Sequence, residues 1–492
     1  MRSNRSQNSE GLGLLLFAVA LLLIGAGGLL WLQIIMIQEE REAPEIVVAT
    51  HTPQPSFTST VEFSPTPKIV VASTFTSLPP TSTPPATVTP TAVRPTSTAT
   101  QTVAQPTSTA TATATPLPPK PTATATPLPP TATPRAPTPT PSPSLPPSKP
   151  LRMNSPEYGM QAFLWWRPEV ASRDLQMIRA AGFTWVKQDF AWREIEGAGK
   201  GKFDWSRTDR IVSDCNAERL DILARLDRQP YWTRSDRAAN GPPNNYQDFA
   251  DFAFALASRY KGRIRAYEVW NEPNLAREWG GKPPNAAEYV RLLRLAYQAI
   301  KRADPNAMVI SAGLTPTGTW SPEATPDDVY LEQMYQAMGG RSDGYFDVLG
   351  AHAPGYKAPP EVSPDEVART PTYGGHRFFC FRRVEDLRAI MVRYGDSNKQ
   401  IAILEFGWTS DPIHPSYAWH RVSEEEKADY LVRAYKWAKE HWSPWIGLMS
   451  LVYFCNHDWT EANEEYWWAI TYPAWPEFKP RPAYDRLKGM PK

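Results

Sequence analysis

Residues 267–275 read Y-E-V-W-N-E-P-N-L and join a strand signal to a chemically active turn. The run 263–269 is rich in strand-forming residues, and Pro273 ends it because proline has no N–H to donate to a sheet. The carboxylate of Glu272 is therefore expected at the C-terminal end of a strand. The amide of Asn271 stands beside it, and Trp270 comes just before.

A second strand end of this kind lies at residues 403–408, which read I-L-E-F-G-W. The apolar run 401–404 leads directly into Glu405. The two glutamates are about 130 residues apart, and at roughly 40 residues per βα unit about three units fit between them. Strands 4 and 7 of one (β/α)₈ barrel satisfy this spacing, and catalytic side chains of such barrels lie at the C-terminal ends of the strands.

W-N-E-P-N at residues 270–274, together with L-E-F-G-W at 404–408, resembles the paired motifs of clan A of the glycoside hydrolases. The resemblance covers about residues 158–459. It implies a TIM barrel with an acid/base glutamate after strand 4 and a nucleophilic glutamate after strand 7. The continuation to Leu275 and Trp279 is most similar to the family of β-xylosidases and α-L-iduronidases. Residues 405–408 are more similar to the cellulase and mannanase families of the same clan.

Strand and helix signals alternate along residues 151–492, as a barrel of this class requires. The expected strands are 158–164, 184–190, 220–226, 263–269, 308–314, 346–352, 401–404 and 446–455. The expected helices are 168–181, 205–217 with Ser206 as its cap, 246–260, 285–303, 424–439 and 483–490. The pattern predicts an α/β domain made of one barrel.

The N-terminal part of the chain predicts a membrane anchor. Residues 1–10 are polar and contain Arg2 and Arg5, whereas residues 11–37 carry no charge and are mostly apolar. About 20 apolar residues cross the hydrocarbon core of a bilayer, so 11–37 are expected to span it. Basic residues favour the cytoplasmic side, which places residues 1–10 in the cytoplasm and the barrel outside the cell. The alternative is secretion after signal cleavage, although the apolar segment is long and no A-x-A site follows it.

Residues 38–150 are dominated by Thr, Pro, Ser and Ala, and the nine residues TATATPLPP occur twice, at 111–119 and 122–130. A segment of this composition buries too little apolar surface to offset its chain entropy, so it is expected to be a disordered linker. Proline favours extended geometry, and Ser/Thr with Pro suits O-glycosylation. The linker is interpreted as a stalk.

Residues 151–492 hold all but one of the 19 tryptophans and all 3 cysteines. The formal net charge of +1 gives no electrostatic reason to expect a nucleic-acid partner. Cys215, Cys380 and Cys455 allow three pairings or none, with Cys380 and Cys455 both expected towards the catalytic face; we expect no pair. The absence of H-x-H, C-x-x-C and phosphate-loop patterns predicts no metal and no cofactor.

Cleavage of a glycosidic bond needs one carboxyl group that protonates the leaving oxygen and one carboxylate that faces the anomeric carbon. The resemblance assigns the first role to Glu272, the second to Glu405, and a hydrogen bond to the sugar 2-hydroxyl to Asn271. The pKa of Glu272 must then be raised, which burial and the neighbouring carboxylate are expected to do. The alternative is two surface glutamates held in salt bridges.

Other residues near strand ends are candidates for substrate binding. His352 and Tyr356 match the His and Tyr that clan members place after strand 6 to orient the nucleophile, although the two are farther apart here. A structural histidine is the alternative. Asp189, at the end of strand 2, is either a ligand of sugar hydroxyls or a helix cap. Three tryptophans after strands 3, 7 and 8 offer faces for sugar stacking or fill the core: Trp232, Trp408 and Trp459.

Two further groups of charges stand out. Residues 373–383 contain Arg377, Arg382 and Arg383, which form either a site for carboxylate or sulfate groups on a glycan or a solvated basic loop.

Within strand 4, alternation puts Glu268 and Trp270 on the inward side with Glu272. A buried Glu268 needs a cation, and Lys187 and Arg225 on the preceding strands are expected to form an ionic cluster with it beneath the active site.

These observations predict a membrane-tethered, retaining glycoside hydrolase that acts outside the cell on a β-linked poly- or oligosaccharide. A non-catalytic carbohydrate-binding barrel for cell-surface attachment is the alternative, and the presence of both glutamates argues against it. A third interpretation makes the stalk the active part, and it predicts that deleting residues 151–492 leaves the function intact. The motifs specify neither the sugar nor the linkage, and neither exo nor endo action.

Overall fold

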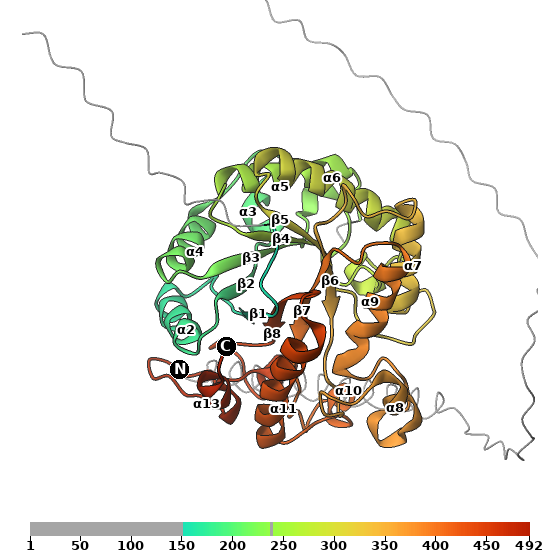
Figure 1. Ribbon diagram of the computed structural model, residues 1–492. Helices are drawn as coiled ribbons and strands as arrows, with labels where there is room; N and C mark the ends of the chain where they lie inside the picture. Colours follow the sequence, from blue (N-terminus) through green and yellow to red (C-terminus); the bar gives the residue numbers. More distant parts are fainter. Residues whose placement is uncertain (1–150, 237–239) are drawn as a thin grey trace, which may run out of the picture. The chain divides into compact units, whose positions relative to one another are not determined.

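The structure, a computed structural model, describes residues 151–236 and 240–492, and its eight strands close into one parallel barrel (Figure 1). Each strand pairs with the next in sequence, and the last pairs with the first. The strands are β1 Glu157–Gln161, β2 Trp185–Asp189, β3 Asp221–Leu226, β4 Ala266–Val269, β5 Met308–Ser311, β6 Val348–His352, β7 Gln400–Phe406 and β8 Ile446–Leu451. The predicted (β/α)₈ barrel is confirmed. The predicted cytoplasmic segment 1–10, anchor 11–37 and linker 38–150 lie outside the described residues.

Helices surround the ring of strands in Figure 1. They are α2 Pro168–Ala180, α3 Trp192–Glu196, α4 Ser206–Ala217, α5 Tyr246–Arg259, α6 Ala286–Ala303, α7 Asp327–Ala337, α8 Pro364–Arg369, α9 Val384–Arg393, α10 Pro415–Ala418, α11 Glu424–Trp437, α12 Glu464–Trp468 and α13 Pro482–Gly489. All six predicted helices are present, and α3, α7, α8, α9, α10 and α12 are additions to them. Within the described ranges, none of the helices is both long enough and apolar enough to cross a bilayer.

Side-chain caps define where several helices begin. Asn285 accepts a hydrogen bond from the Glu288 N–H at the start of α6, and Ser423 and Glu426 form a reciprocal capping box at the start of α11. The prediction that Ser206 caps α4 is wrong. Ser206 is the first helical residue, and its own N–H is accepted by the Asp204 carboxylate at 3.0 Å.

Two apolar layers separate the inside of the barrel from its outside. The inner cluster comes almost entirely from strands and includes Trp185, Leu223 and Ala266, whereas the outer cluster mixes strands and helices. The prediction that Trp270 points inward with Glu268 is wrong. Trp270 has a φ of 76°, which ends strand alternation, and its ring packs outside the barrel against those of Phe249 and Trp279.

The three cysteines are free thiols buried in three separate apolar clusters. Burial raises the pKa of Cys215, Cys380 and Cys455 to about 12 in each case, so all three are protonated at neutral pH. They act as small apolar side chains in the packing, because the thiolate form is the reactive one.

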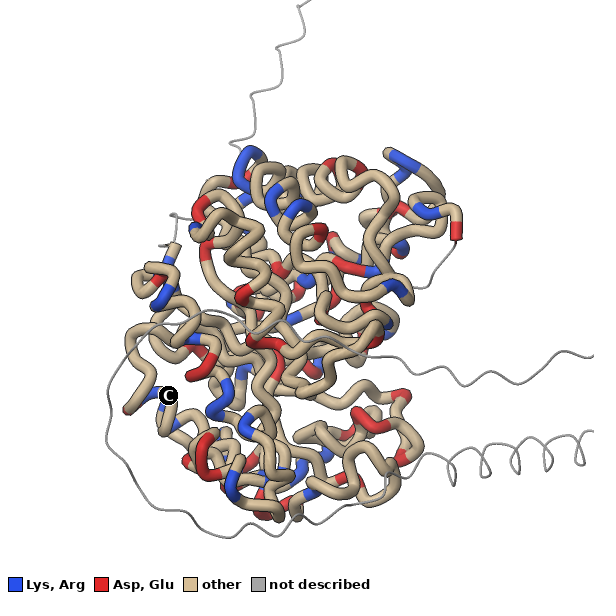
Figure 2. Tube along the Cα trace, turned by 90° about the vertical axis from the view of Figure 1, so that its right-hand side faces the viewer, with Lys and Arg blue, Asp and Glu red and all other residues tan. Residues whose placement is uncertain are grey.

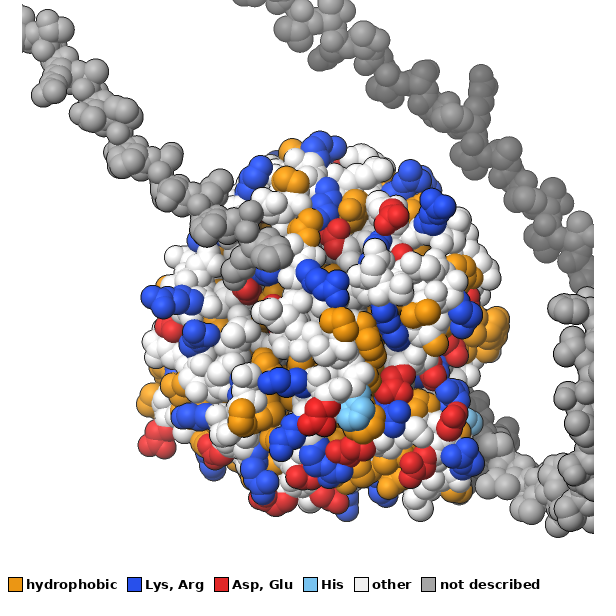
Figure 3. Space-filling model, viewed as in Figure 1, with side chains coloured by type: hydrophobic (Ala, Val, Ile, Leu, Met, Phe, Trp, Pro, Cys, Tyr) orange, Lys and Arg blue, Asp and Glu red, His pale blue; other side chains and the backbone are white. Residues whose placement is uncertain are grey.

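Charges of both signs are interspersed along the described trace (Figure 2). The face seen in Figure 3 likewise shows Lys and Arg side chains next to Asp and Glu. This mixing agrees with the formal net charge of +1 for the whole chain. The face in Figure 3 presents no single-sign surface of the kind that attracts nucleic acid.

Candidate active site

The chain leaves β4 through a strained turn that carries the first glutamate. Trp270 and Glu272 have positive φ angles of 76° and 39°. Such backbone costs about 1–3 kcal/mol per residue and persists only where the surroundings fix it. The Trp270 N–H donates to the Leu226 carbonyl at 3.0 Å, and the Glu272 N–H donates to the Gly313 carbonyl at 3.1 Å. The neighbouring ends of β3 and β5 therefore hold the turn in place.

The second asparagine of the W-N-E-P-N motif ties this turn to the loop after β5. Asn274 is fully buried, and its amide donates to the carbonyls of Thr315 and Thr325 at 2.9 and 3.0 Å. Its side-chain oxygen accepts the Thr315 N–H at 3.0 Å. The indole of Trp270 donates to the Glu278 carbonyl at 2.9 Å. The motif thus contains framework residues as well as the carboxylate of Glu272.

A bulge brings the histidine of β6 next to the second glutamate. The register between β6 and β7 shifts between Ala351 and His352, so that His352 lies opposite Glu405. Bulges next to active sites re-aim side chains in this way. Gly313 makes room for the imidazole, since a Cβ atom there would lie 2.2 Å from Nε2 of His352. Any larger residue at position 313 would displace the ring.

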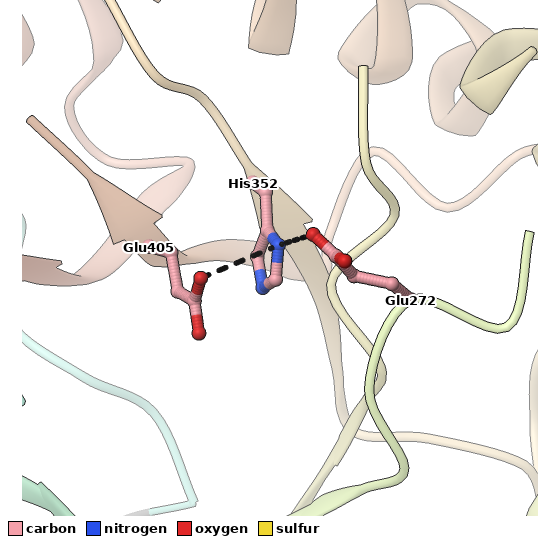
Figure 4. Close-up of side chains that lie close together, drawn as sticks. All are labelled: Glu272, His352 and Glu405. Carbon is pink, nitrogen blue, oxygen red and sulfur yellow. Dashed lines mark hydrogen bonds and ion pairs between the residues drawn. The ribbon is translucent and has the colours of Figure 1, made fainter. Parts of the chain in front are cut away.

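His352 stands between the two glutamates (Figure 4). Its Nδ1 lies 3.0 Å from Oε1 of Glu272 and 3.8 Å from Oε2 of Glu405. One oxygen of each carboxylate lies within 4.8 Å of the other. The side chains of Glu272 and Glu405 are 13% and 19% exposed, so the alternative of two surface glutamates does not hold.

A buried cation supports the second glutamate from inside the barrel. Nζ of Lys187 lies 3.0 Å from Oε1 of Glu405 and 3.1 Å from Oε2 of Glu268. Arg225 adds a contact of 3.4 Å to the same Glu405 oxygen. Lys187 and Glu268 are 1% and 0% exposed. The predicted ionic cluster beneath the site is confirmed, and it extends upward to include Glu405.

These charges determine the ionisation of Glu405 and His352. Burial raises the pKa of Glu405, but the charges of Lys187, His352 and Arg225 outweigh burial and lower it below the usual value. Burial lowers the pKa of His352, but Glu405 and Glu272 outweigh it and raise the pKa. Glu405 is therefore a carboxylate and His352 holds its proton more tightly than a free imidazole.

The pKa of Glu272 differs from the expectation. Burial raises it, but the hydrogen bond and charge of His352 and the charge of Arg277 outweigh burial and lower the pKa to about 2. A raised pKa was expected because two carboxylates repel each other's charge. That repulsion is overcome here because a protonated imidazole lies between them. The site therefore favours the protonated form of His352 and the ionised form of Glu272.

A cavity of about 580 Å³ opens above these groups, within the range typical of small-molecule sites. It contains most of the predicted site residues. The wall is formed by Gln161, Phe163, Arg193, Arg225, Asp227, Arg228, Asn240, Asn271, Glu272, Arg277, Glu278, Thr315, Pro316, His352, Pro354, Tyr356, Glu405, Phe406, Tyr417, His420, Val452, Tyr453, Trp459, Glu464, Glu465 and Trp468.

Only one of the three predicted stacking tryptophans reaches this cavity. Trp459 lies in its wall, with its ring 4.6 Å from Phe163. Trp232 lies outside the wall, and its indole donates to the Glu196 carbonyl at 2.7 Å. Trp408 is fully buried and donates to the Ala358 carbonyl at 3.0 Å. A stacking role for Trp232 and Trp408 does not fit these positions.

Of the other predicted substrate-binding residues, some lie in the cavity wall and some lie outside it. Asn271 lies in the wall, and its side-chain oxygen accepts from Arg225 at 3.5 Å. Tyr356 also lies in the wall, but its hydroxyl donates to the Pro316 carbonyl at 3.4 Å and is not hydrogen-bonded to Glu405. Asp189 lies outside the wall and pairs with Arg225 and Arg228 at 3.4 and 3.1 Å. It therefore supports arginines of the site and caps no helix.

The arginines of the basic loop 373–383 form ion pairs with acidic side chains of the same domain. Arg377 pairs with Asp365 and Asp386, Arg382 with Glu385, and Arg383 with Asp327, all at 2.7–2.9 Å. None of these three arginines lies in the cavity wall. They fasten the loop to α9 and α7 and supply no subsite for an anionic sugar.

Sequence reasoning missed several residues of the wall. Tyr453 follows β8 by two positions, so the rule that strand ends carry the site would have found it. Tyr417 lies in α10 and Trp468 in α12, the short helices that follow β7 and β8, and no pattern in the sequence marks them. Arg277 follows Glu272 by five positions and contacts it, and only its charge distinguishes it in the sequence.

The three side chains Glu272, His352 and Glu405 are close enough together to surround a metal ion. Their charges are already balanced by cationic side chains, however. Lys187 and Arg225 contact Glu405, and Arg277 contacts Glu272 at 3.1 Å. A divalent ion would be repelled by three cationic side chains, so this donor set is poorly suited to one.

The buried cluster makes a prediction about stability. Lys187→Met should lower the free energy of unfolding by about 3–5 kcal/mol, because Glu268 and Glu405 lose their shared cation in a buried site. Lys200 is the matched control, since it also bridges two carboxylates, Asp248 and Asp251, but its side chain is 42% exposed. Lys200→Met should lower the free energy of unfolding by less than about 1 kcal/mol. Urea unfolding followed by tryptophan fluorescence measures both, and equal losses would contradict the prediction.

Comparisons with known proteins agree with the resemblance drawn from the motifs. The family described as cellulase (glycosyl hydrolase family 5) matches residues 149–336, a range that contains Glu272 and ends before Glu405. A β-xylosidase from Geobacillus stearothermophilus is 29% identical over 133 residues, which are 24% of this chain and 25% of the relative. The matched region thus spans a quarter of that relative's length.

Solved structures with similar folds include further glycosidases. A family 39 glycoside hydrolase from Bacteroides cellulosilyticus WH2 has a TM-score of 0.48 at 21% identity, over 69% of this chain and 63% of that one. A glucosidase from Croceicoccus marinus also has a TM-score of 0.48, at 12% identity over 69% of this chain and 67% of that one.

Proposed function

We propose, from the place of this barrel in glycoside hydrolase clan A, that it hydrolyses β-linked poly- or oligosaccharides with retention of configuration. Glu405 acts as the nucleophile and Glu272 as the acid/base. Glu405 forms a bond to the anomeric carbon while the glycosidic bond breaks, and the leaving oxygen takes a proton from Glu272. Water then attacks the glycosyl-enzyme, Glu272 takes its proton, and Glu405 is released.

The distance between the two carboxylates is the observation that supports retention. Retaining enzymes hold these groups about 5–5.5 Å apart, and inverting enzymes about 6.5–9.5 Å apart to admit a water molecule. Oxygens of Glu272 and Glu405 lie within 4.8 Å of each other. This short approach supports retention.

The proton on His352 supports an acid role for Glu272 despite its low pKa. Nδ1 of His352 is 3.0 Å from Oε1 of Glu272, which is hydrogen-bond distance. As Glu405 forms its bond to the anomeric carbon, its negative charge falls and its hold on the imidazole proton weakens in the same step. The proton passes through Glu272 to the leaving oxygen while the glycosidic bond breaks, so that His352 and Glu272 together act as the general acid.

The location outside the cell and the substrate class form part of the same proposal. The apolar segment 11–37 and the Thr/Pro-rich segment 38–150 support a tethered enzyme whose barrel stands away from the membrane. The β-xylosidase relative supports a β-xyloside as one substrate. This carbohydrate is the substrate that binds in the cavity.

A panel of substrates tests the proposal. The full-length protein is incubated with 4-nitrophenyl β-D-xyloside, β-D-glucoside, β-D-galactoside and β-D-mannoside, and with xylan, cellulose and mannan. We expect at least one to be cleaved, with NMR showing the β-anomer as first product. Binding without cleavage throughout the panel would favour the alternative, a non-catalytic barrel for cell-surface attachment. An α-anomer as first product would contradict retention.

A further inference from the structure

Arg277 makes a contact with the acid/base glutamate that the proposed reaction does not use. It lies in the short 3₁₀ helix Ala276–Glu278, directly after the turn that carries Glu272. Its Nη2 is 3.1 Å from Oε2 of Glu272, the oxygen that His352 does not contact. The two oxygens of Glu272 therefore have different cationic partners, one on each side.

Exposure sets Arg277 apart from the other cationic side chains that contact Glu272 or Glu405. The side chains of Lys187, His352 and Arg225 are 1%, 3% and 9% exposed, whereas that of Arg277 is 71% exposed. The buried groups are fixed by packing and by each other. Arg277 is the partner of Glu272 that an incoming substrate reaches and displaces.

We infer that Arg277 is a positioning residue that opposes Glu272 as an acid in the first half of the reaction and supports it as a base in the second half. The inference rests on the proposed function. A guanidinium beside a carboxylate stabilises its ionised form, which is the wrong form for donating a proton and the right form for accepting one. One residue thus has opposite effects on the two chemical steps.

In the first step the leaving oxygen needs the proton that passes through Glu272. Arg277 makes protonated Glu272 less stable, so it slows the step unless the substrate displaces it. In the second step the leaving group has departed, and Arg277 can return to Oε2. The carboxylate is then ready to take a proton from water, which attacks the anomeric carbon as the bond to Glu405 breaks.

Aryl glycosides with different leaving groups separate the two steps. Glycosides of weakly acidic phenols need the proton, so formation of the glycosyl-enzyme limits the rate of their hydrolysis. Strongly acidic phenols leave without it, so hydrolysis of the glycosyl-enzyme limits turnover. The measurement takes kcat and kcat/KM for one sugar, the best of the panel above, with phenyl, 4-nitrophenyl and 2,4-dinitrophenyl leaving groups.

Arg277→Gln should raise kcat/KM for the phenyl glycoside and lower kcat for the 2,4-dinitrophenyl glycoside. Each change should be about two- to five-fold, the size expected for an ion pair with one exposed partner. Arg277→Lys should restore both values towards wild type because it keeps the charge. Arg228→Gln is the control, since Arg228 lies in the same wall, is 54% exposed and pairs with Asp189 instead of Glu272. Arg228→Gln should not shift kcat/KM for the phenyl glycoside and kcat for the 2,4-dinitrophenyl glycoside in opposite directions.

Changes in the same direction for both substrates would overturn the inference and show that Arg277 only supports the local structure. No change in either would overturn it as well. Absence of hydrolysis in the wild type would count against the proposed function instead, and a second measurement then decides on Arg277. With ¹⁵N-labelled histidine, NMR titration of the full-length protein should show a higher pKa for His352 in Arg277→Gln, and an unchanged value would overturn the inference.

The direction of that titration follows from the charges around the pair. Removing Arg277 takes away a positive charge, which favours every protonated form nearby and raises the pKa of both Glu272 and His352. The other groups facing them stay in place in this variant. They are Lys187 on β2, Arg225 on β3, Glu278 in the same 3₁₀ helix, Glu405 on β7, and the loop residues Tyr356, Tyr417 and Tyr453.

Discussion

Glu405→Gln should reduce kcat roughly 10⁴-fold or more for every substrate, because the amide cannot form the glycosyl-enzyme. Lys187 makes the consequence especially severe. In the wild type it pairs with both Glu405 and Glu268, and in the variant its charge faces a neutral amide at the point where negative charge is needed. A leaving group of any acidity should fail equally, since the missing step is the attack itself.

Glu425→Gln is the matched control for this variant. It makes the same chemical change on α11, where the Glu425 side chain is 71% exposed and makes only a distant pair with Arg486 at 3.7 Å. Its activity should stay within about two-fold of wild type, as for most exposed positions. Residual activity of Glu405→Gln above a hundredth of wild type, in a folded protein, would show that another group is the nucleophile.

The two glutamates could be located from the sequence because each follows a signal that depends only on neighbouring residues. Pro273 marks the end of one strand, and the apolar run 401–404 leads into the other. Lys187 could be predicted as the partner of Glu268 for a similar reason. A charge inside a barrel strand needs an opposite charge, and the nearest strands offered few.

The tryptophans show where this reasoning fails. Trp408 follows Glu405 by three residues and was a candidate either for sugar stacking or for core packing. Its ring packs beneath Gly355, where a Cβ atom would lie 1.8 Å from the indole. Whether a ring after a strand faces sugar or core depends on loops distant in sequence, here the one after β6. Local pattern cannot reveal that contact.

The protonation of the site was unpredictable for a related reason. His352 is 80 residues from Glu272, and it reaches both glutamates because the β6–β7 register shifts by one residue and Gly313 leaves room for the ring. A one-residue change in register is invisible in the sequence, yet it decides which group holds the proton. The prediction of a raised pKa for Glu272 considered burial and the neighbouring carboxylate but not the charges of His352 and Arg277, and so it had the wrong direction.

Glu272→Gln should affect substrates very differently from one another. Glycosides with poor leaving groups should lose about 10²–10⁴-fold in kcat/KM, the usual contribution of a general acid. A 2,4-dinitrophenyl glycoside should still form the glycosyl-enzyme at a rate near that of the wild type. Hydrolysis of that intermediate should then be slow, because the attacking water has lost its base, and the intermediate should accumulate to a level visible by mass spectrometry.

Azide gives the decisive test of which glutamate has which role. It attacks without needing a base, so it should restore turnover of Glu272→Gln and yield a glycosyl azide of retained configuration, since it displaces Glu405 from the intermediate. The surroundings of residue 272 favour this rescue. His352 and Arg277 both lose the carboxylate they contact, and their charge then attracts the anion to the face from which water would attack. In Glu405→Gln azide can only attack the substrate directly, which gives the inverted product or none. An inverted azide from Glu272→Gln would therefore mean that the two glutamates have exchanged roles.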